Sequence, residues 1–217
     1  MKMRRIKVTN KNFEYAFSAA IEIIKQGGVV AIPTDTSYGL AADALNEESV
    51  LKVFRIKRRS LSKPLSIFVD SVKTIEKYFI VDEVAAKLIS LLPERLTLIL
   101  KAKDPSIFPR GIANEQGGVG VRLPPSIYPV ELVRATKTFL TATSANLSGK
   151  PPIYNPFLIE KELRDVDLIL DAGVLKRVPT STVIDLTSCP PAVIREGSVP
   201  LKTLEKRTGL RFSIKTM

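Results

Sequence analysis

Short apolar runs alternate with amphipathic stretches along most of the chain. Apolar side chains recur at helical spacing between residues 10 and 26, and Gly27-Gly28 ends that pattern. The next run, residues 29–32, is short and continuously apolar, which is typical of a buried strand. A second helix is expected over residues 48–57. The first quarter of the chain therefore predicts a buried strand between two helices.

The same alternation continues through the rest of the chain. Further strands are expected over residues 65–69, 97–101, 119–122, 139–142, 168–171, 182–186 and 192–195. Further helices are expected over residues 82–92, 129–136, 156–163 and 200–208. Strands that alternate with helices predict an α/β sheet covered by helices on its faces. Residues 103–118 lack periodicity and are expected to form a loop. With no internal repeat and no long polar linker, residues 1–217 are expected to form a single domain.

The amino-acid composition excludes several kinds of chemistry. The chain has no histidine and one cysteine, Cys189. Ser-His-Asp and Cys-His mechanisms, histidine metal ligands, an intrachain disulfide and a multi-cysteine zinc site are therefore excluded. No apolar run approaches the ~20 residues of a membrane span, and the basic N-terminus has no signal-peptide apolar region. We expect a cytoplasmic protein without a membrane partner.

The charge balance narrows the class of partner. Lys and Arg number 33 against 22 Asp and Glu, which gives a formal net charge of +11. Such an excess favours polyanionic partners such as nucleotides or RNA. A lysine-rich surface, as in many proteins of thermophiles, explains it equally well. Charge thus indicates a type of partner and leaves the reaction open.

Polar segments directly follow several predicted strands or helices. The segment PTDTSYGL, residues 33–40, follows the first strand, and TATSANLSGKPP, residues 141–152, lies at the end of another. In open α/β sheets ligands gather beyond strand ends. An ordinary turn explains PTDTSYGL alone about as well, whereas the hydroxyls, amides and glycine of TATSANLSGKPP suit the close approach of phosphate or carboxylate oxygens. Neither segment has Walker A or GxGxxG spacing.

Basic residues form a second group of candidates. The run Lys57-Arg58-Arg59, with Lys63 shortly after, ends a predicted helix. Cations are favourable at a helix C-terminus, which is a purely structural explanation. Three adjacent cations also repel one another, and an anionic ligand would relieve that repulsion. Single arginines at strand ends, such as Arg122 in GVRLP, are each weak candidates.

These segments, in this order, resemble the Sua5/YrdC/TsaC family of L-threonylcarbamoyladenylate synthases, in its short, single-domain form. The matching strings are GGVVAIPTDTSYGLAADA, IKRRSLSKPLSIFV, LTLILKA, GVGVRLP, TATSANLSGKPP, STVID and IREGSV. They extend over about residues 27–198. The resemblance implies a twisted, mixed sheet around a basic concave surface.

The resemblance also implies a reaction. L-Threonine, bicarbonate and ATP would give threonylcarbamoyl-AMP and pyrophosphate, with Mg²⁺ held mainly by the ATP phosphates and no metal site in the protein. The product would serve N6-threonylcarbamoyladenosine (t6A) modification of tRNA, which makes tRNA and tRNA-modification proteins possible partners. By the same resemblance the catalytic residues would be Lys57, Arg59, Ser144 and Asn146. Thr36 and Ser181 would bind threonine. Nucleotide contacts would come from Arg59, Lys63, Thr97, Arg122, Ser144, Ser148 and Arg195.

Two positions depart from the family pattern. In the family, the residues corresponding to Lys57 and Arg59 form a KxR motif. Many members have a histidine in the strand that follows this motif, where this chain has Phe68. Members often carry Pro-Gly-Pro before the threonine of LTLIL, where this chain has Pro93-Glu94-Arg95-Leu96. The effect of Phe68 and the geometry of the second segment stay open from sequence alone.

Two other functions compete with this prediction. A non-catalytic RNA-binding protein, gripping tRNA or rRNA with a basic concavity, accounts for the charge and leaves the polar strand-end segments unexplained. An O-carbamoyltransferase-like module is suggested because hydrogenase-maturation proteins share the fold. Those proteins carry zinc-finger cysteines that this chain lacks.

Overall fold

The apolar run after the first helix forms a strand that is buried on both sides. In the computed structural model, which describes residues 3–214, β2 spans Val30–Pro33. Alternate residues of the run belong to two separate hydrophobic clusters: Val29 and Ala31 pack in one, Val30 and Ile32 in the other. Because successive strand side chains point to opposite faces, a strand with no polar position needs cover on both.

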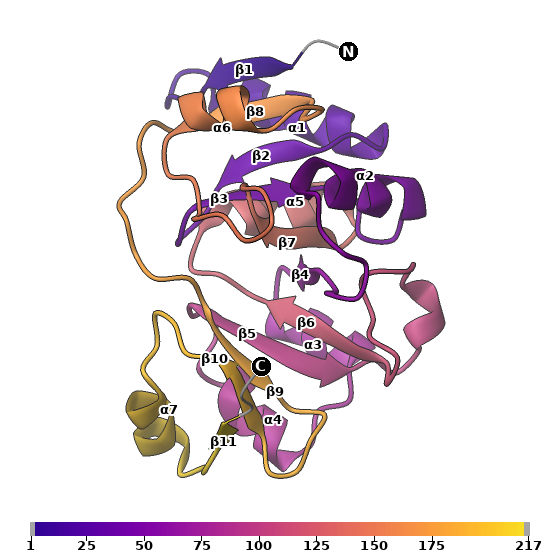
Figure 1. Cartoon of the computed structure of the whole chain (residues 1–217), viewed down its shortest axis with the longest axis vertical. Coiled ribbons are helices and arrows are strands. Elements are labelled where there is room, and N and C mark those ends of the chain that lie inside the picture. The colour runs from indigo at the N-terminus through magenta and orange to yellow at the C-terminus, as the bar shows by residue number, and fades with distance from the viewer. Residues whose placement is uncertain (1–2, 215–217) are drawn as a thin grey trace.

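Eleven strands form one mixed sheet among the described residues, in the order β1-β8-β2-β3-β7-β4-β6-β5-β9-β10-β11 (Figure 1). Their bounds are β1 Arg4–Lys7, β3 Tyr38–Ala41, β4 Ser66–Phe68, β5 Leu96–Lys101, β6 Gly118–Arg122, β7 Leu140–Ser144, β8 Leu168–Asp171, β9 Thr182–Asp185, β10 Ala192–Arg195 and β11 Ser213–Ile214. β2 and β3 form an antiparallel hairpin, whereas β8 runs parallel to β1 and β2. Three residue pairs between β4 and β7 join the two halves of the sheet.

Helices cover both faces of the sheet. They are α1 Phe13–Lys25, α2 Glu47–Lys57, α3 Val72–Tyr78, α4 Glu83–Ile89, α5 Ile127–Thr136, α6 Pro156–Glu162 and α7 Leu201–Thr208, with a short 3₁₀ turn η1 at Pro105–Ile107. α1 and α5 pack beside each other and, with β2 and β8, enclose the smaller hydrophobic cluster. α2, α3 and α4 contribute buried residues to the larger cluster on the opposite side. No helix within residues 3–214 is both long and apolar enough to cross a membrane.

The α/β architecture expected from the sequence is confirmed, and several boundaries differ. Residues 33–40 were expected to form one polar loop, but only the middle of the segment is a turn, and Tyr38 begins β3. Tyr38 can be buried in a strand because its hydroxyl donates to the carbonyl oxygen of Gly173 at 2.8 Å. The helix expected over residues 82–92 ends at Ile89, a few residues before Pro93. β1, β3, α3 and β11 had not been predicted.

Candidate active site

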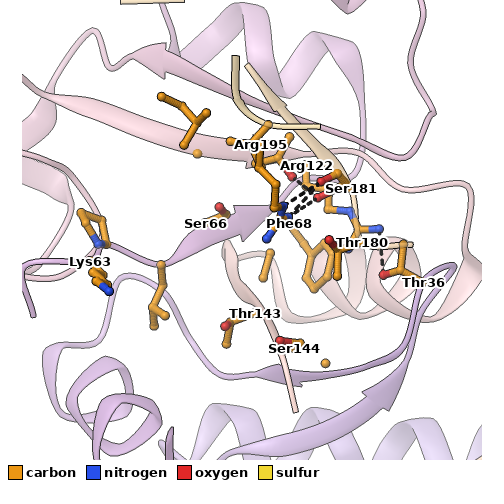
Figure 2. Close-up of a pocket in the computed structure, with 18 of the residues that line it drawn as sticks. Thr36, Lys63, Ser66, Phe68, Arg122, Thr143, Ser144, Thr180, Ser181 and Arg195 are labelled. Atoms are coloured by element: carbon orange, nitrogen blue, oxygen red, sulfur yellow. Dashed lines mark hydrogen bonds between the residues drawn. The ribbon is translucent and has the colours of Figure 1, made fainter. Parts of the chain in front are cut away.

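A cavity of about 700 Å³ lies over the middle of the sheet (Figure 2). Its wall is made by β3, β4, β5, β6, β7, β9 and β10, together with the segments that follow β2 and α2. Glycines let backbone form part of this wall: a Cβ on Gly120 would overlap Ser66 Oγ, and a Cβ on Gly39 would lie 3.2 Å from the carbonyl oxygen of Thr143. The cavity thus lies where the two halves of the sheet meet.

The charged side chains that line the cavity are all cations. They are Arg59, Lys63, Arg122 and Arg195, and no carboxylate lines the cavity within the described part of the chain. Burial lowers the pKa of all three arginines, and the neighbouring charges of Arg122 and Arg59 lower the pKa of Arg195 further. A guanidinium group still stays positive at neutral pH. These groups therefore repel one another, and a polyanion would relieve that repulsion.

Arg195, at the end of β10, reaches across to the start of β9. Its Nη2 donates to the carbonyl oxygen of Ser181 at 2.9 Å and to Ser181 Oγ at 3.3 Å. The hydroxyls of Ser181 and Thr97 lie 2.8 Å apart. Figure 2 shows Arg195, Ser181 and Arg122 gathered at one side of the cavity. Four residues predicted from separate segments are thus brought together here.

The position of Arg59 follows from the way α2 ends. Arg58 takes a left-handed conformation, with φ of 49°, and turns the chain off the helix. Arg59 Nε then donates to the carbonyl oxygen of Lys63 at 2.7 Å, and its Nη2 donates to that of Pro64 at 3.1 Å. These bonds fix the guanidinium against its own loop, at the wall of the cavity.

Arg122, at the end of β6, meets the turn that follows β2. Its Nη2 donates to both carboxylate oxygens of Asp35, at 2.7 and 2.8 Å, and to Thr36 Oγ1 at 3.3 Å. Arg95 also contacts this residue, and its Nε donates to the Asp35 carbonyl oxygen at 3.2 Å. Asp35 and Arg95 were not among the residues predicted from sequence. Asp35 lies in a segment already recognised as polar, but nothing local indicated its distant partners.

Two of the predicted catalytic residues lie behind the cavity wall. Lys57 is 2% exposed, and its Nζ donates to the carbonyl oxygens of Ser144 and, at 2.8 Å, Asn146. Asn146 Nδ2 donates to the carbonyl oxygens of Leu147 and Lys150. Neither Lys57 nor Asn146 lines the cavity. Both side chains hold the backbone that follows β7. Burial, and then the charge of Arg59, lower the pKa of Lys57 to about 7.

The segment held in this way presents small polar groups to the cavity. Ser144, Ser148 and Gly149 line it, and the Ser148 amide donates to the carbonyl oxygen of Lys57 at 2.8 Å. Gly149 has φ of +81°, which favours glycine. The basic run Lys57-Arg58-Arg59 and the segment Ser144-Ala145-Asn146 therefore meet directly, through Lys57.

Phe68 replaces the histidine expected from the family resemblance and lies on the cavity wall. It is buried on β4, and the Arg122 guanidinium carbon is 5.7 Å from its ring centroid. An aromatic face beside a cation is favourable, and the ring supplies no hydrogen-bond donor. This stretch of wall is therefore apolar.

Most of the predicted site residues lie on one surface. The cavity is lined by Thr36, Arg59, Lys63, Thr97, Arg122, Ser144, Ser148, Ser181 and Arg195. Sequence reasoning missed several other lining residues, among them Ser66, Asn114, Thr143 and Thr180. Thr143 belongs to the quoted motif TATSANLSGKPP and directly precedes the predicted Ser144, which was an available signal.

The lining residues offer little to a metal ion. No group of three or more Asp, Glu, Cys or His side chains that could hold one occurs within residues 3–214. Mg²⁺ prefers oxygen ligands, chiefly carboxylates and phosphates. A magnesium ion here would depend on ligands brought by a substrate.

Relatives of the chain were found over most of its length. A "Putative threonylcarbamoyl-AMP synthase" of Methanocaldococcus jannaschii is 40% identical over 214 residues, which cover 95% of this chain and 99% of that protein. The threonylcarbamoyl-AMP synthase of Pyrococcus abyssi is 34% identical over 94% of this chain. The match covers 60% of the P. abyssi protein, so the chain spans about three-fifths of that relative.

Solved structures agree with the sequence relatives. P. abyssi Sua5 complexed with L-threonine matches with a TM-score of 0.84 at 32% identity, over 96% of this chain and 61% of that one. Escherichia coli YciO matches with a TM-score of 0.80 at 26% identity, over 93% of this chain and 97% of that one. A family model named for Sua5, YciO and YrdC, and described as "Telomere recombination", matches residues 22–197. The chain belongs to the Sua5/YciO/YrdC family.

Proposed function

We propose that this protein is an L-threonylcarbamoyladenylate synthase, which forms threonylcarbamoyl-AMP and pyrophosphate from L-threonine, bicarbonate and ATP. Its relatives in M. jannaschii and P. abyssi carry the name of this enzyme, and the Sua5 structure holds L-threonine. The observation that supports the proposal most is the cavity itself, which gathers four cations and many hydroxyl groups and is lined by no carboxylate among the described residues. Such a wall suits substrates that carry several negative charges.

The proposed reaction has two chemical steps. The threonine amine attacks the carbon of bicarbonate, and loss of water gives a carbamate. A carbamate oxygen then attacks the α-phosphorus of ATP, and the bond to the bridging oxygen breaks to release pyrophosphate. Both steps bring negative groups together, so positioning and neutralisation of charge are the main catalytic demands.

The cavity offers a site for each substrate. Arg59 and Arg195 are suited to bind ATP phosphates, with Lys63 at the same wall. Thr36 and Ser181 would bind threonine through their hydroxyls. Arg122, which contacts Thr36, would stand between the two substrates. We assign Lys57 and Asn146 an indirect role, because they hold the segment that carries Ser144 and Ser148.

The remaining requirements follow from the substrates. Mg²⁺ would arrive bound to the ATP phosphates, since no carboxylate lines the cavity within residues 3–214. The adenylate would be consumed in the t6A modification of tRNA in the cytoplasm. A net charge of +11 suits direct contact with tRNA or with its modification proteins.

The test is a reaction with purified protein. Incubation with ATP, Mg²⁺, bicarbonate and L-threonine should release pyrophosphate and form threonylcarbamoyl-AMP, which mass spectrometry can detect. Omission of threonine should abolish pyrophosphate release. RNA binding that falls steeply with salt, in a protein that binds neither ATP nor threonine, would establish the RNA-binding alternative instead.

A variant of one lining cation provides the control. Arg59→Ala should lower adenylate formation by about 10²-fold, the usual scale for loss of one charge contact in the transition state. Arg110→Ala removes an exposed arginine that does not line the cavity, and it should keep full activity. Equal activity of the Arg59 variant and the unmodified protein would remove Arg59 from the mechanism.

A further inference from the structure

Arg95 occupies the segment where this chain departs from the Pro-Gly-Pro pattern of its family. The segment lies just before β5, yet the Arg95 side chain reaches the turn after β2, sixty residues away in sequence. Arg95 Nε donates to the Asp35 carbonyl oxygen at 3.2 Å and lies 3.8 Å from Asp35 Oδ2. The departure from the family pattern thus creates a connection between two walls of the cavity.

Asp35 lies between two arginines of unequal exposure. The Asp35 side chain is 2% exposed, the Arg122 side chain 10% and the Arg95 side chain 40%. A buried carboxylate needs compensating charge, and the contacts at 2.7 and 2.8 Å from Arg122 supply it. The residue is therefore strongly held, although it does not line the cavity.

The turn that carries Asp35 is itself well ordered by hydrogen bonds. Thr34 Oγ1 donates to the carbonyl oxygen of Ser37 at 2.7 Å and accepts from the Thr36 amide at 3.2 Å. Asp35 and Thr36 meet the same nitrogen of Arg122, as Figure 2 shows for Thr36. A change at Asp35 would therefore be felt by both lining residues at once.

The pairing with Asp35 also determines which nitrogen of the Arg122 guanidinium has no hydrogen-bond partner within residues 3–214. Nη2 is occupied by Asp35 and Thr36, whereas Nε is buried and has no hydrogen-bond partner among the described residues. A buried donor without a partner is costly unless a ligand satisfies it. The carboxylate thus fixes the orientation in which Arg122 can meet an anionic oxygen.

We propose that Asp35 and Arg95 are positioning residues, which hold Thr36 and Arg122 in the geometry that binds the amino-acid substrate. The inference rests on the proposed function and adds to it two residues that do not line the cavity. Asp35 acts through its charge on Arg122, and Arg95 acts through its hydrogen bond to the turn that carries Asp35.

The first test compares Asp35→Asn with the unmodified enzyme. Loss of the charge releases Arg122, so the KM for threonine should rise by at least about 10-fold, within the range up to about 10²-fold that misplacement of a binding group can cost. The KM for ATP should rise less than the KM for threonine, because Arg122 stands between the two substrates whereas Arg59, Lys63 and Arg195 still face the phosphates. Asp35→Glu keeps the charge and should restore part of the threonine affinity.

Arg95→Gln is the second test, because the Arg95 side chain is 40% exposed and its replacement leaves the buried core intact. The KM for threonine should rise by about 2- to 5-fold, as expected for loss of a partly exposed ion pair. Asp167→Asn is the matched control: like Asp35, Asp167 pairs with a basic side chain, that of Lys52 at 2.6 Å, but it lies outside the cavity wall. It should lower the melting temperature and leave both KM values unchanged.

The outcomes separate this inference from the proposed function. Absence of threonine-dependent pyrophosphate release in the unmodified protein would overturn the proposed function. An active unmodified enzyme whose Asp35→Asn and Arg95→Gln variants keep the threonine KM would overturn the positioning role alone. Equal increases in both KM values would do the same, because they would indicate general damage.

Discussion

At the scale of single residues, Lys57 is the clearest example of a side chain that was predicted to contact substrate and instead holds backbone. Its amine lies among backbone carbonyl oxygens instead of facing the cavity. The sequence did hold a signal for this. Val50, Val53 and Phe54 are buried on α2, and Lys57 follows at the helical spacing that places it on the same face. The basic run around it concealed that periodicity.

The burial of Lys57 predicts a pH dependence of stability. Its pKa falls from 10.5 to about 7 in the fold, so between these values the unfolded chain binds a proton that the folded chain does not. The free energy of unfolding should therefore rise with pH across this window, by up to about 1.4 kcal/mol per unit. Below pH 7 both states bind the proton, and the slope contributed by Lys57 disappears.

Denaturant unfolding measures this effect when the protein is compared with Lys57→Met. Methionine keeps the length of the side chain and cannot titrate. The difference in unfolding free energy between the two proteins should grow in favour of lysine from about pH 7.5 to about pH 9.5. A constant difference over that range would show that the Lys57 amine is charged in the fold.

At the scale of secondary-structure elements, the pairing of β4 with β6 shapes the cavity. Gly120 on β6 faces Ser66 on β4, and an added Cβ would overlap Ser66 Oγ and lie 3.0 Å from Ser66 Cβ. Both residues line the cavity. A side chain at position 120 would therefore force the strands apart at the wall.

Gly120→Ala should lower the free energy of unfolding by about 1–3 kcal/mol, the usual cost of an overpacked site. Ser66→Gly removes the two side-chain atoms that the new methyl group meets. Thermal or urea unfolding of the double variant should therefore show less destabilisation than the sum of the single variants. Strict additivity would mean that the two side chains do not meet.

The elements that sequence reasoning recovered and missed differ in physical character. The buried strands and long amphipathic helices were found because their burial imposes a periodic pattern. β1 was missed because Arg4–Lys7 is an edge strand with three exposed positions and three cations. β3 was missed because the four residues just before it in the sequence, 34–37, are polar. In addition, the buried Tyr38 depends on a hydrogen bond to the distant Gly173. Local pattern carries no information about such partners.

In the candidate site, too, some features could be predicted from local sequence and others depend on distant contacts. Loops rich in hydroxyls and cations could be recognised from their composition, and they do meet in one cavity. The direction of each side chain depends on tertiary contacts. Asp35 and Arg122 are 87 residues apart, as are Lys57 and Ser144, so neither pairing could be read from a local segment.

At the scale of the whole molecule, the chain carries a formal net charge of +11, and the four charged side chains that line the cavity are cations. ATP should therefore bind less tightly as salt rises, by at least about 10-fold between about 0.05 and about 0.5 M, since salt screens charges over shorter distances. Adenosine, which has no phosphates, should show little change. Calorimetric titration of both ligands measures this, and equal responses would mean that the cations do not hold the phosphates.

The residues between β8 and β9 form a connector that links the two halves of the sheet along one side of the molecule (Figure 1). Cleavage there would leave Arg59 and Arg122 on one fragment and Ser181 and Arg195 on the other. The shorter fragment would have to insert β9 beside β5 to restore the wall. Nucleotide binding would then become a reporter of fragment complementation, since the cavity wall is complete only when both pieces are joined.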